Sequence, residues 1–405
     1  MTFLFKILKK DKFSLARVGV ISTGKAKLET PYLIPVATRA HIISLSPKDI
    51  KNLKIQATLA NTYHLHLKPG DKIIKKQGGL HKLMRFPGVI YTDSGGFQAF
   101  SLGDAKKHGL SKLNTNTQLA KHRKKQNMEG SLVRITNSGV HFKSIYDNSN
   151  HFLDAKKSME IQSNLGADAI MAFDECSSAN KSLNYQKQAL KRTNNWALLS
   201  LKHKDKKQAL YGIIQGGKYK SLREKSAKFI LSHPFEGIAV GGSFGSSYGD
   251  SKKAMLEVLD WLSPIWISDN RPRHMLGIGW IDDIFELVER GIDTFDCVHM
   301  TRIARHGNLL ISPESGGKIS NKFKIKIKSG KFKDQKIRID NKCRCEFCKN
   351  YNRSEAYALV KSDKLKFGRL ATIHNISFML DLMKQIRESI KQDRFQKLKN
   401  KWLNK

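Results

Sequence analysis

The feature that most constrains the fold is a series of eight short apolar segments, most of which end at or beside a glycine or a polar residue. Helical patterns lie between many of them. Strands that alternate with helices form parallel sheets, and eight such units predict a closed (β/α)8 barrel, the TIM-barrel architecture. The expected strands are Tyr32–Val36, Ala57–Ala60, Val89–Thr92, Ala167–Phe173, Leu210–Ile214, Gly237–Val240, His274–Ile278 and Thr294–Val298. The expected helices are Ser46–Lys54, Lys156–Leu165, Leu183–His203, Leu222–His233, Ser251–Trp261 and Ile281–Glu289.

An open doubly wound sheet is the alternative architecture for such a pattern. It is disfavoured because no G-x-G-x-x-G fingerprint follows the first strand. We therefore assign residues 13–310 to an α/β barrel, and residues 311–405 to a metal-binding subdomain with C-terminal helices. A basic insertion at about 104–132 interrupts the barrel region.

The chain is strongly basic, with 73 Lys and Arg against 35 Asp and Glu, a formal charge of +38 over 405 residues. Such a charge favours a polyanionic partner such as nucleic acid, although an abundance of lysine throughout the chain would give the same excess. No apolar stretch approaches the ~18–20 residues of a membrane helix. The apolar run at the start of the chain is also too short for a secretory signal. We expect a cytoplasmic protein with no membrane segment.

Three of the five cysteines, Cys343, Cys345 and Cys348, fall within six residues. The odd count and the tight spacing argue against a disulfide framework. Three thiolates on one loop can bind a single borderline cation and leave one tetrahedral position open. His374, just before an apolar run at Ile376–Met383 that predicts a helix, is the candidate for that position among 14 histidines. Three Cys and one His form a closed structural zinc set, and three clustered free thiols are the alternative.

Three carboxylates lie at or near the ends of expected strands: Asp93 and Asp174 directly follow a strand, and Asp296 lies within the last one. The carboxyl ends of barrel strands meet at one mouth, where active sites are built. Two carboxylates there can act as nucleophile and general acid/base in breaking a glycosidic bond. The third, with Gln215 and the backbone at Gly241-Gly242, could bind the edge of a flat heterocycle. The alternative is that each Asp caps a turn.

Several of these segments carry motifs in a characteristic order. They are Asn61-Thr62-Tyr63-His64-Leu65, Asp93-Ser94-Gly95-Gly96-Phe97-Gln98, Gly212-Ile213-Ile214-Gln215-Gly216-Gly217, Ala239-Val240-Gly241-Gly242, Phe295-Asp296-Cys297-Val298 and the cysteine cluster. From about Phe13 to the C-terminal helix, the chain resembles bacterial tRNA-guanine transglycosylases (queuine tRNA-ribosyltransferases). The step of 26 residues from Cys348 to His374 also fits the zinc site of that family.

The resemblance implies a double displacement on tRNA. Asp296 would attack the ribose of the wobble guanosine and form a covalent intermediate, and Asp93 would act as general acid/base for the incoming base. The resemblance gives the other residues supporting roles: base-edge binding by Asp174, Gln215 and the Gly242 amide, stacking by Phe97 and Met275, support by Ser94 and Asn61, anticodon-loop contacts by Arg302 and Arg305, and one structural Zn²⁺ at Cys343, Cys345, Cys348 and His374. The implied partners are a tRNA with a G-U-N anticodon, free guanine, queuine or its aminomethyl precursor, and a second copy of the chain in a homodimer.

Two departures from the family pattern stand out. The segment from about Asp104 to Leu132 is longer than expected for the family. Its two interpretations are an extra tRNA-contacting loop and a surface insertion, and we favour the surface insertion because loops tolerate insertions. Gly245 and Ser247 stand where the family pattern has a larger aliphatic residue and a glutamate. A glycine removes bulk beside the base, so we expect queuine itself to be accepted.

Two other classes of protein are alternatives for this sequence. A noncatalytic tRNA-binding partner subunit would share the fold and the zinc site, but it would need neither Asp93 nor Asp296. A zinc-dependent hydrolase would need an open coordination position at the barrel mouth, whereas the cysteine cluster lies past the last strand.

Overall fold

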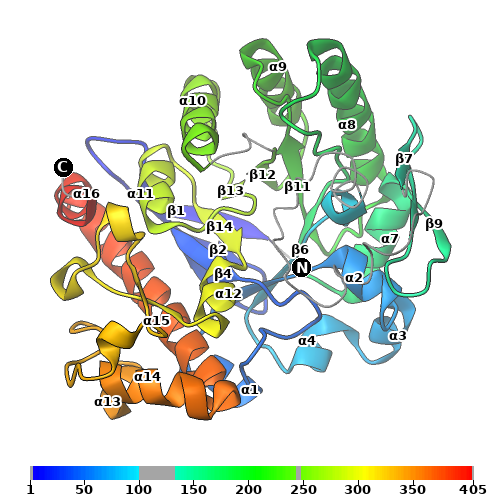
Figure 1. Cartoon of the computed structure of the whole chain (residues 1–405). Helices are drawn as coiled ribbons and strands as arrows, with labels where there is room; N and C mark the ends of the chain where they lie inside the picture. The colour runs from blue at the N-terminus through cyan, green and yellow to red at the C-terminus, as the bar shows by residue number, and fades with distance from the viewer. Residues whose placement is uncertain (1–2, 100–132, 243–247, 404–405) are drawn as a thin grey trace.

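The computed structural model describes residues 3–99, 133–242 and 248–403, and its centre is a barrel of eight parallel strands (Figure 1). The strands are β4 (Tyr32–Pro35), β5 (Ala57–Ala60), β6 (Val89–Thr92), β10 (Ala169–Met171), β11 (Ala209–Ile214), β12 (Gly237–Val240), β13 (Arg273–Met275) and β14 (Thr294–Cys297). They pair in the order β4-β14-β13-β12-β11-β10-β6-β5. A parallel bridge between Val36 and Leu59 joins β4 to β5 and closes the barrel. The predicted (β/α)8 barrel is confirmed.

The helices expected between the strands are present, with ends that differ by a few residues. They are α1 (Pro47–Asn52), α7 (Ala155–Leu165), α8 (Leu183–His203), α9 (Lys220–Leu231), α10 (Tyr248–Trp266) and α11 (Ile281–Glu289). The short helices α2 (Thr62–Leu67), α3 (Asp71–Lys76), α4 (Gly79–Met84) and α12 (His299–Arg305) also lie outside the barrel strands. At α1, Ser46 and Asp49 form a capping box, in which each side chain accepts a hydrogen bond from the backbone of the other.

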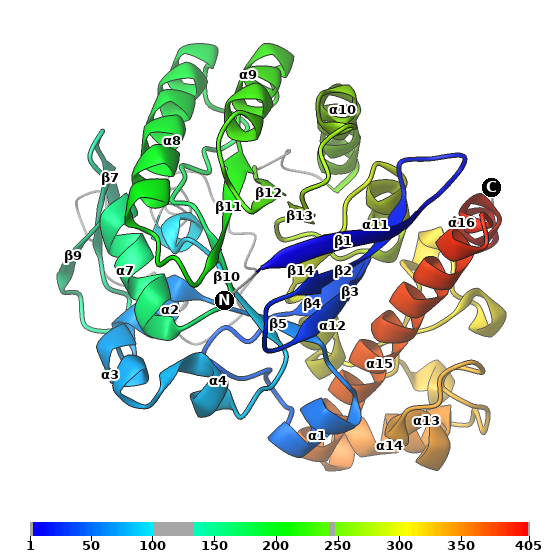
Figure 2. The same cartoon turned by 180° about the vertical axis from the view of Figure 1, so that it is seen from behind.

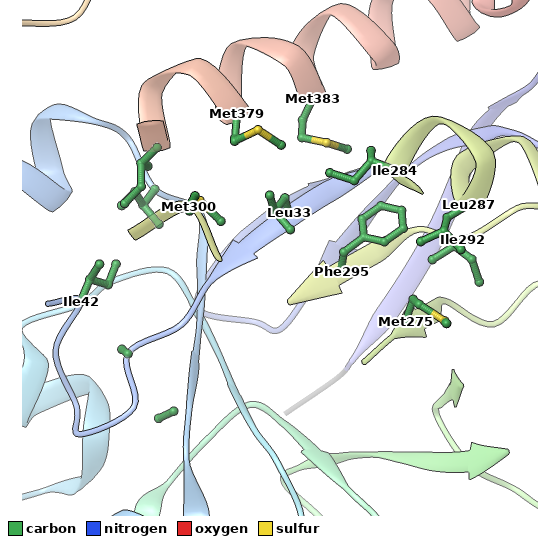
Figure 3. Packing of buried hydrophobic residues seen from close by; sticks show 14 of the residues in the cluster. Leu33, Ile42, Met275, Ile284, Leu287, Ile292, Phe295, Met300, Met379 and Met383 are labelled. Atoms are coloured by element: carbon green, nitrogen blue, oxygen red, sulfur yellow. The ribbon is translucent and has the colours of Figure 1, made fainter. Parts of the chain in front are cut away.

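Side chains of the strands alternate between two hydrophobic clusters, because successive residues of a strand point to opposite faces. On β4, Tyr32 and Ile34 belong to the cluster inside the barrel, and Leu33 belongs to the cluster between strands and helices. Figure 3 shows part of the outer cluster, where Leu33 and Phe295 lie between the strands and the surrounding helices.

Two three-stranded antiparallel sheets were not anticipated from the sequence. The first consists of β1 (Leu4–Lys10), β2 (Arg17–Ser22) and β3 (Lys27–Thr30), which Figure 2 shows lying beside the barrel strands β4 and β5. Phe3, just before β1, makes an edge contact with Tyr211 of the barrel interior. The second sheet consists of β7 (Val133–Ile135), β8 (Val140–Lys143) and β9 (Asn150–Leu153).

The C-terminal part packs on the outside of the barrel. It contains the hairpin β15 (Asn308–Leu310) and β16 (Lys324–Lys326), followed by α13 (Glu346–Asn350), α14 (Arg353–Ser362), α15 (Lys364–Lys391) and α16 (Phe395–Leu403). Helix α15 runs along α12 and β4, and its Met379 and Met383 face the outer cluster (Figures 1 and 3). The helix expected at 376–383 is thus the middle of a 28-residue helix. His374 lies inside this helix, rather than before it as the sequence suggested. None of the described helices is both long and apolar enough to cross a membrane.

Candidate active site

Asp93 lies directly after β6 and is held by the start of α2. Its Oδ1 accepts hydrogen bonds from the backbone N–H groups of Thr62 (2.9 Å) and Gly95 (3.2 Å). Its Oδ2 accepts a bond from the side-chain amide of Asn61, the residue that caps α2. Burial raises the pKa of Asp93 to about 7, against the effect of the Thr62 N–H, and the negative charge of Asp296 adds to the rise. A carboxyl group with this pKa can both give and take a proton near neutral pH.

Asp174 follows β10 and is almost fully buried. Ser94 Oγ donates to its Oδ1 (3.1 Å), and Gln215 Nε2, at the end of β11, donates to its Oδ2 (2.7 Å). Burial raises the pKa of Asp174 to about 6, although the bonds from Gln215 and Ser94 oppose this rise. A carboxylate, an amide and a hydroxyl therefore converge next to Asp93, because three neighbouring strands end at the same face.

The backbone after β12 is fixed by a buried arginine. Arg223 of α9 donates from Nη1 to the carbonyl oxygens of Ile214 (3.0 Å) and Gly241 (2.7 Å), which joins the ends of β11 and β12. At Gly242, φ is +136°, and an added Cβ would lie 2.4 Å from Arg223 Nη2. Only glycine therefore fits at position 242, and its backbone stays close to the arginine.

Asp296 points from β14 into the mouth, with 13% of its side chain exposed. Its Oδ1 lies 3.2 Å from His274 Nε2 and accepts a hydrogen bond from the N–H of Gly277 (3.0 Å). The positive φ of Gly277, +74°, turns the chain after β13 so that this N–H meets the carboxylate. This turn is also why β13 ends at Met275, short of the expected Ile278.

The two residues expected to stack on a base are placed differently from each other. Phe97 is 40% exposed and follows the glycine pair after Asp93. Met275 is fully buried and packs with Phe295 and Ile292 in the outer cluster (Figure 3). The expectation for Met275 is therefore wrong: its side chain points away from the mouth, and the half-buried Leu276, which packs against the interior cluster, occupies the inner face instead.

A second group of reactive side chains lies in the C-terminal part. Cys343, Cys345, Cys348 and His374 are all buried, and their ligand atoms lie within 4.8 Å of one another. His374 Nδ1 lies 3.5 Å from Cys345 Sγ and 3.2 Å from Cys348 Sγ. Its Nε2 lies 2.8 Å from the Leu310 carbonyl oxygen, to which it must donate, so Nδ1 is left as the ligand atom. Four buried soft and borderline donors around one point fit a metal ion.

Comparison with known proteins agrees with this arrangement. Residues 11–405 match the family described as queuine tRNA-ribosyltransferase. The chain belongs to this family. A protein of Archaeoglobus fulgidus, provisionally named a queuine tRNA-ribosyltransferase, is 47% identical over 408 residues, with 100% of both chains covered. The queuine tRNA-ribosyltransferase of Thermoanaerobacter pseudethanolicus is 38% identical over 99% of this chain and 97% of its own, and that of Desulforamulus reducens is 40% identical over 97% and 96%.

Membership of the queuine tRNA-ribosyltransferase family confirms the family and the enzyme class predicted from the sequence, a glycosyltransferase that acts on tRNA. The predicted anticodon contacts, Arg302 and Arg305, are half-buried on α12, directly after the strand that carries Asp296. The insertion at 104–132 and the residues Gly245 and Ser247 lie outside the described part of the chain, so the expectations for them stay predictions.

A group of aromatic and basic residues next to α12 was not predicted from the sequence. The rings of Trp280 and His299 are 3.7 Å apart between centroids. Lys322 and Lys324, from the hairpin before the cysteine cluster, place their Nζ atoms 4.8 and 5.4 Å from the Trp280 ring centre. Burial, together with the positive charges of Lys324, Arg302 and Lys322, lowers the pKa of His299 to about 4. The only sequence signal for this group of residues is the lysine-rich composition of the segment 318–328.

Proposed function

We propose that the chain replaces the wobble guanine of tRNAs with a G-U-N anticodon by a 7-deazaguanine base, through a covalent bond between Asp296 and the ribose. The observation that carries the proposal is a pair of carboxyl groups in different environments at one barrel mouth. Asp296 is held by two donors, whereas Asp93 has a pKa raised to about 7. This difference suits a nucleophile and a proton carrier.

In the first step, a lone pair of the Asp296 carboxylate forms a bond to C1′ of the ribose. The C1′–N9 bond breaks, its electrons stay on guanine N9, and protonated Asp93 supplies the proton that neutralises the departing base. In the second step, Asp93 takes the N9 proton of the incoming base. The N9 lone pair then attacks C1′, and the Asp296 carboxylate leaves. Asp93 and Asp296 return to their starting states.

The base is recognised along its polar edge by Asp174, Gln215 and the backbone amide of Gly242, with Ser94 orienting Asp174. We assign the stacking surfaces to Phe97 and Leu276, with Leu276 in place of Met275. Asn61 holds Asp93. We keep queuine as the expected base, on the hypothesis that Gly245 leaves room for it. Competition between queuine and its aminomethyl precursor for one pool of tRNA tests this, and a clear preference for the smaller base would contradict it.

The anticodon loop would be contacted by Arg302, Arg305, Lys322 and Lys324. Clustered cationic side chains of this kind bind the phosphates of a nucleic-acid backbone. We infer that the enzyme works as a cytoplasmic homodimer on tRNA. The metal at Cys343, Cys345, Cys348 and His374 would be one Zn²⁺, which prefers this donor set. With four protein ligands the ion has no open position, so its role is structural.

The test is exchange of labelled guanine into unmodified tRNA by the wild type and by Asp296→Ala. We expect incorporation by the wild type alone, together with a denaturation-resistant tRNA adduct that the variant lacks. Incorporation by both would identify another nucleophile. Intact tRNA binding without incorporation by either would favour the noncatalytic partner subunit.

A further inference from the structure

A buried histidine lies behind the carboxylate of Asp296. His274 of β13 is fully buried inside the barrel. Its ring stacks on Tyr91, with centroids 5.7 Å apart and an angle of 20° between the planes, and meets the edge of Tyr211 at 6.4 Å. Burial raises the pKa of both phenols well above the usual value, so these neighbours are uncharged. The ring is thus clamped between neutral aromatic side chains and cannot turn without displacing them.

The contacts of the two ring nitrogens determine which one carries the proton. Nε2 lies 3.2 Å from Asp296 Oδ1, and Nδ1 lies 2.9 Å from Thr294 Oγ1. A carboxylate oxygen only accepts hydrogen bonds, so Nε2 must be protonated. In the neutral ring, Nδ1 then accepts a hydrogen bond from the Thr294 hydroxyl. Thr294 and Asp296 lie on the same face of β14, which is why one ring reaches both.

The two oxygens of Asp296 are therefore not equivalent. Oδ1 receives the hydrogen bonds of His274 and of the Gly277 N–H. Within the residues that the structure describes, no hydrogen bond to Oδ2 is present. One oxygen is fixed and the other is left for a ligand.

We propose that His274 is a positioning residue for the nucleophile: by binding Oδ1 it turns Oδ2 toward C1′ of the ribose. The proposal rests on the proposed function of Asp296. When Oδ2 bonds to C1′, the C1′–N9 electrons leave with the base, and Oδ1 becomes the carbonyl oxygen of the ester, still bound to His274 and Gly277. When the incoming base displaces the ester, the electrons of the Oδ2–C1′ bond return to the carboxylate. The two donors then stabilise the charge that forms.

Two nearly isosteric substitutions test this role. His274→Gln keeps an N–H donor at the position of Nε2, and His274→Met fills similar space without a donor. The measurement is the single-turnover rate of covalent adduct formation with tRNA in the absence of free base, together with the Kd for tRNA. We expect His274→Met to slow adduct formation about tenfold or more and His274→Gln to stay within about threefold of the wild type, both with an unchanged Kd.

Thr294→Val provides a second measurement if His274→Met does not fold. It keeps the histidine but removes the hydroxyl that holds Nδ1, so the ring is oriented less firmly toward Asp296 and adduct formation should slow by about threefold to tenfold. Unchanged rates in folded His274→Met or in Thr294→Val would overturn the proposal, as would equal losses in the Gln and Met variants. Failure of the wild type to form any adduct would instead refute the role of Asp296 on which the proposal depends.

Discussion

A single methyl group at Gly241 should separate base recognition from folding. A Cβ at this position would lie 2.5 Å from Gln215 Nε2 and 3.0 Å from Ile213 Cγ2. The backbone at Gly241 is not in the left-handed region, so alanine brings no backbone strain. The nearest atom is the far end of a flexible side chain, which can move away. In Gly241→Ala we therefore expect Gln215 to leave its hydrogen bond of 2.7 Å to Asp174.

The size of the effect follows from that one bond. A hydrogen bond to a charged group contributes about 1.5–3 kcal/mol. If the bond orients Asp174 toward the base, its loss should raise the KM for guanine about 10- to 150-fold. The assay is guanine exchange into tRNA over a range of guanine concentrations. Adduct formation without free base reports separately on the attack by Asp296.

Gly330→Ala is the matched control, because an added Cβ at Gly330 meets no atom within 4 Å. We expect its KM and melting temperature to equal those of the wild type. A KM for Gly241→Ala that equals that of the control, in a folded enzyme, would refute the contact of Gln215 and Asp174 with the base.

Three further predictions concern the proton carrier, the metal and the tRNA surface. The pKa of Asp93 is raised to about 7 in the folded chain, so ionisation of this group lowers the stability of the fold as the pH rises from about 4 to 7. Asp93→Asn should therefore lose exchange activity but have a higher melting temperature than the wild type above about pH 7. An equal difference in melting temperature at pH 4 and pH 8 would contradict the raised pKa. His374→Ala should lower both the bound zinc, measured by atomic absorption, and the melting temperature; a metal-free variant as stable as the wild type would exclude a structural ion. Lys322→Ala combined with Lys324→Ala should reduce the slope of log Kd for tRNA against log salt by about 1 to 2, whereas an unchanged slope would place both lysines outside the interface.

The barrel could be predicted from the sequence because strands buried on both faces appear as continuous apolar runs. The two three-stranded antiparallel sheets could not be predicted in this way. Strand β1 alternates exposed and half-buried residues, and β7 has three residues, none of them fully buried, so neither gives a strong signal by itself. Their pairing depends on partners elsewhere in the chain, which local patterns do not reveal.

The candidate site divides in the same way. Asp93, Asp174 and Asp296 could be found because each is at a strand end, and all such ends meet at one face. Met275 was misplaced because a shift of one residue along a strand exchanges the inner and outer faces. His274 escaped notice because its contact with Asp296 joins residues that are 22 positions apart on neighbouring strands, and its own sequence surroundings are ordinary.

The most direct test of the central claim is the site of the covalent bond to tRNA. The wild type would be incubated with an unmodified G-U-N tRNA without free base, digested with nuclease and protease, and analysed by mass spectrometry. We expect a ribose-linked peptide in which Asp296 carries the added mass, and loss of this product when guanine is added before digestion. A ribose-linked peptide modified at Asp93 or Asp174, or an adduct that guanine does not release, would contradict double displacement through Asp296.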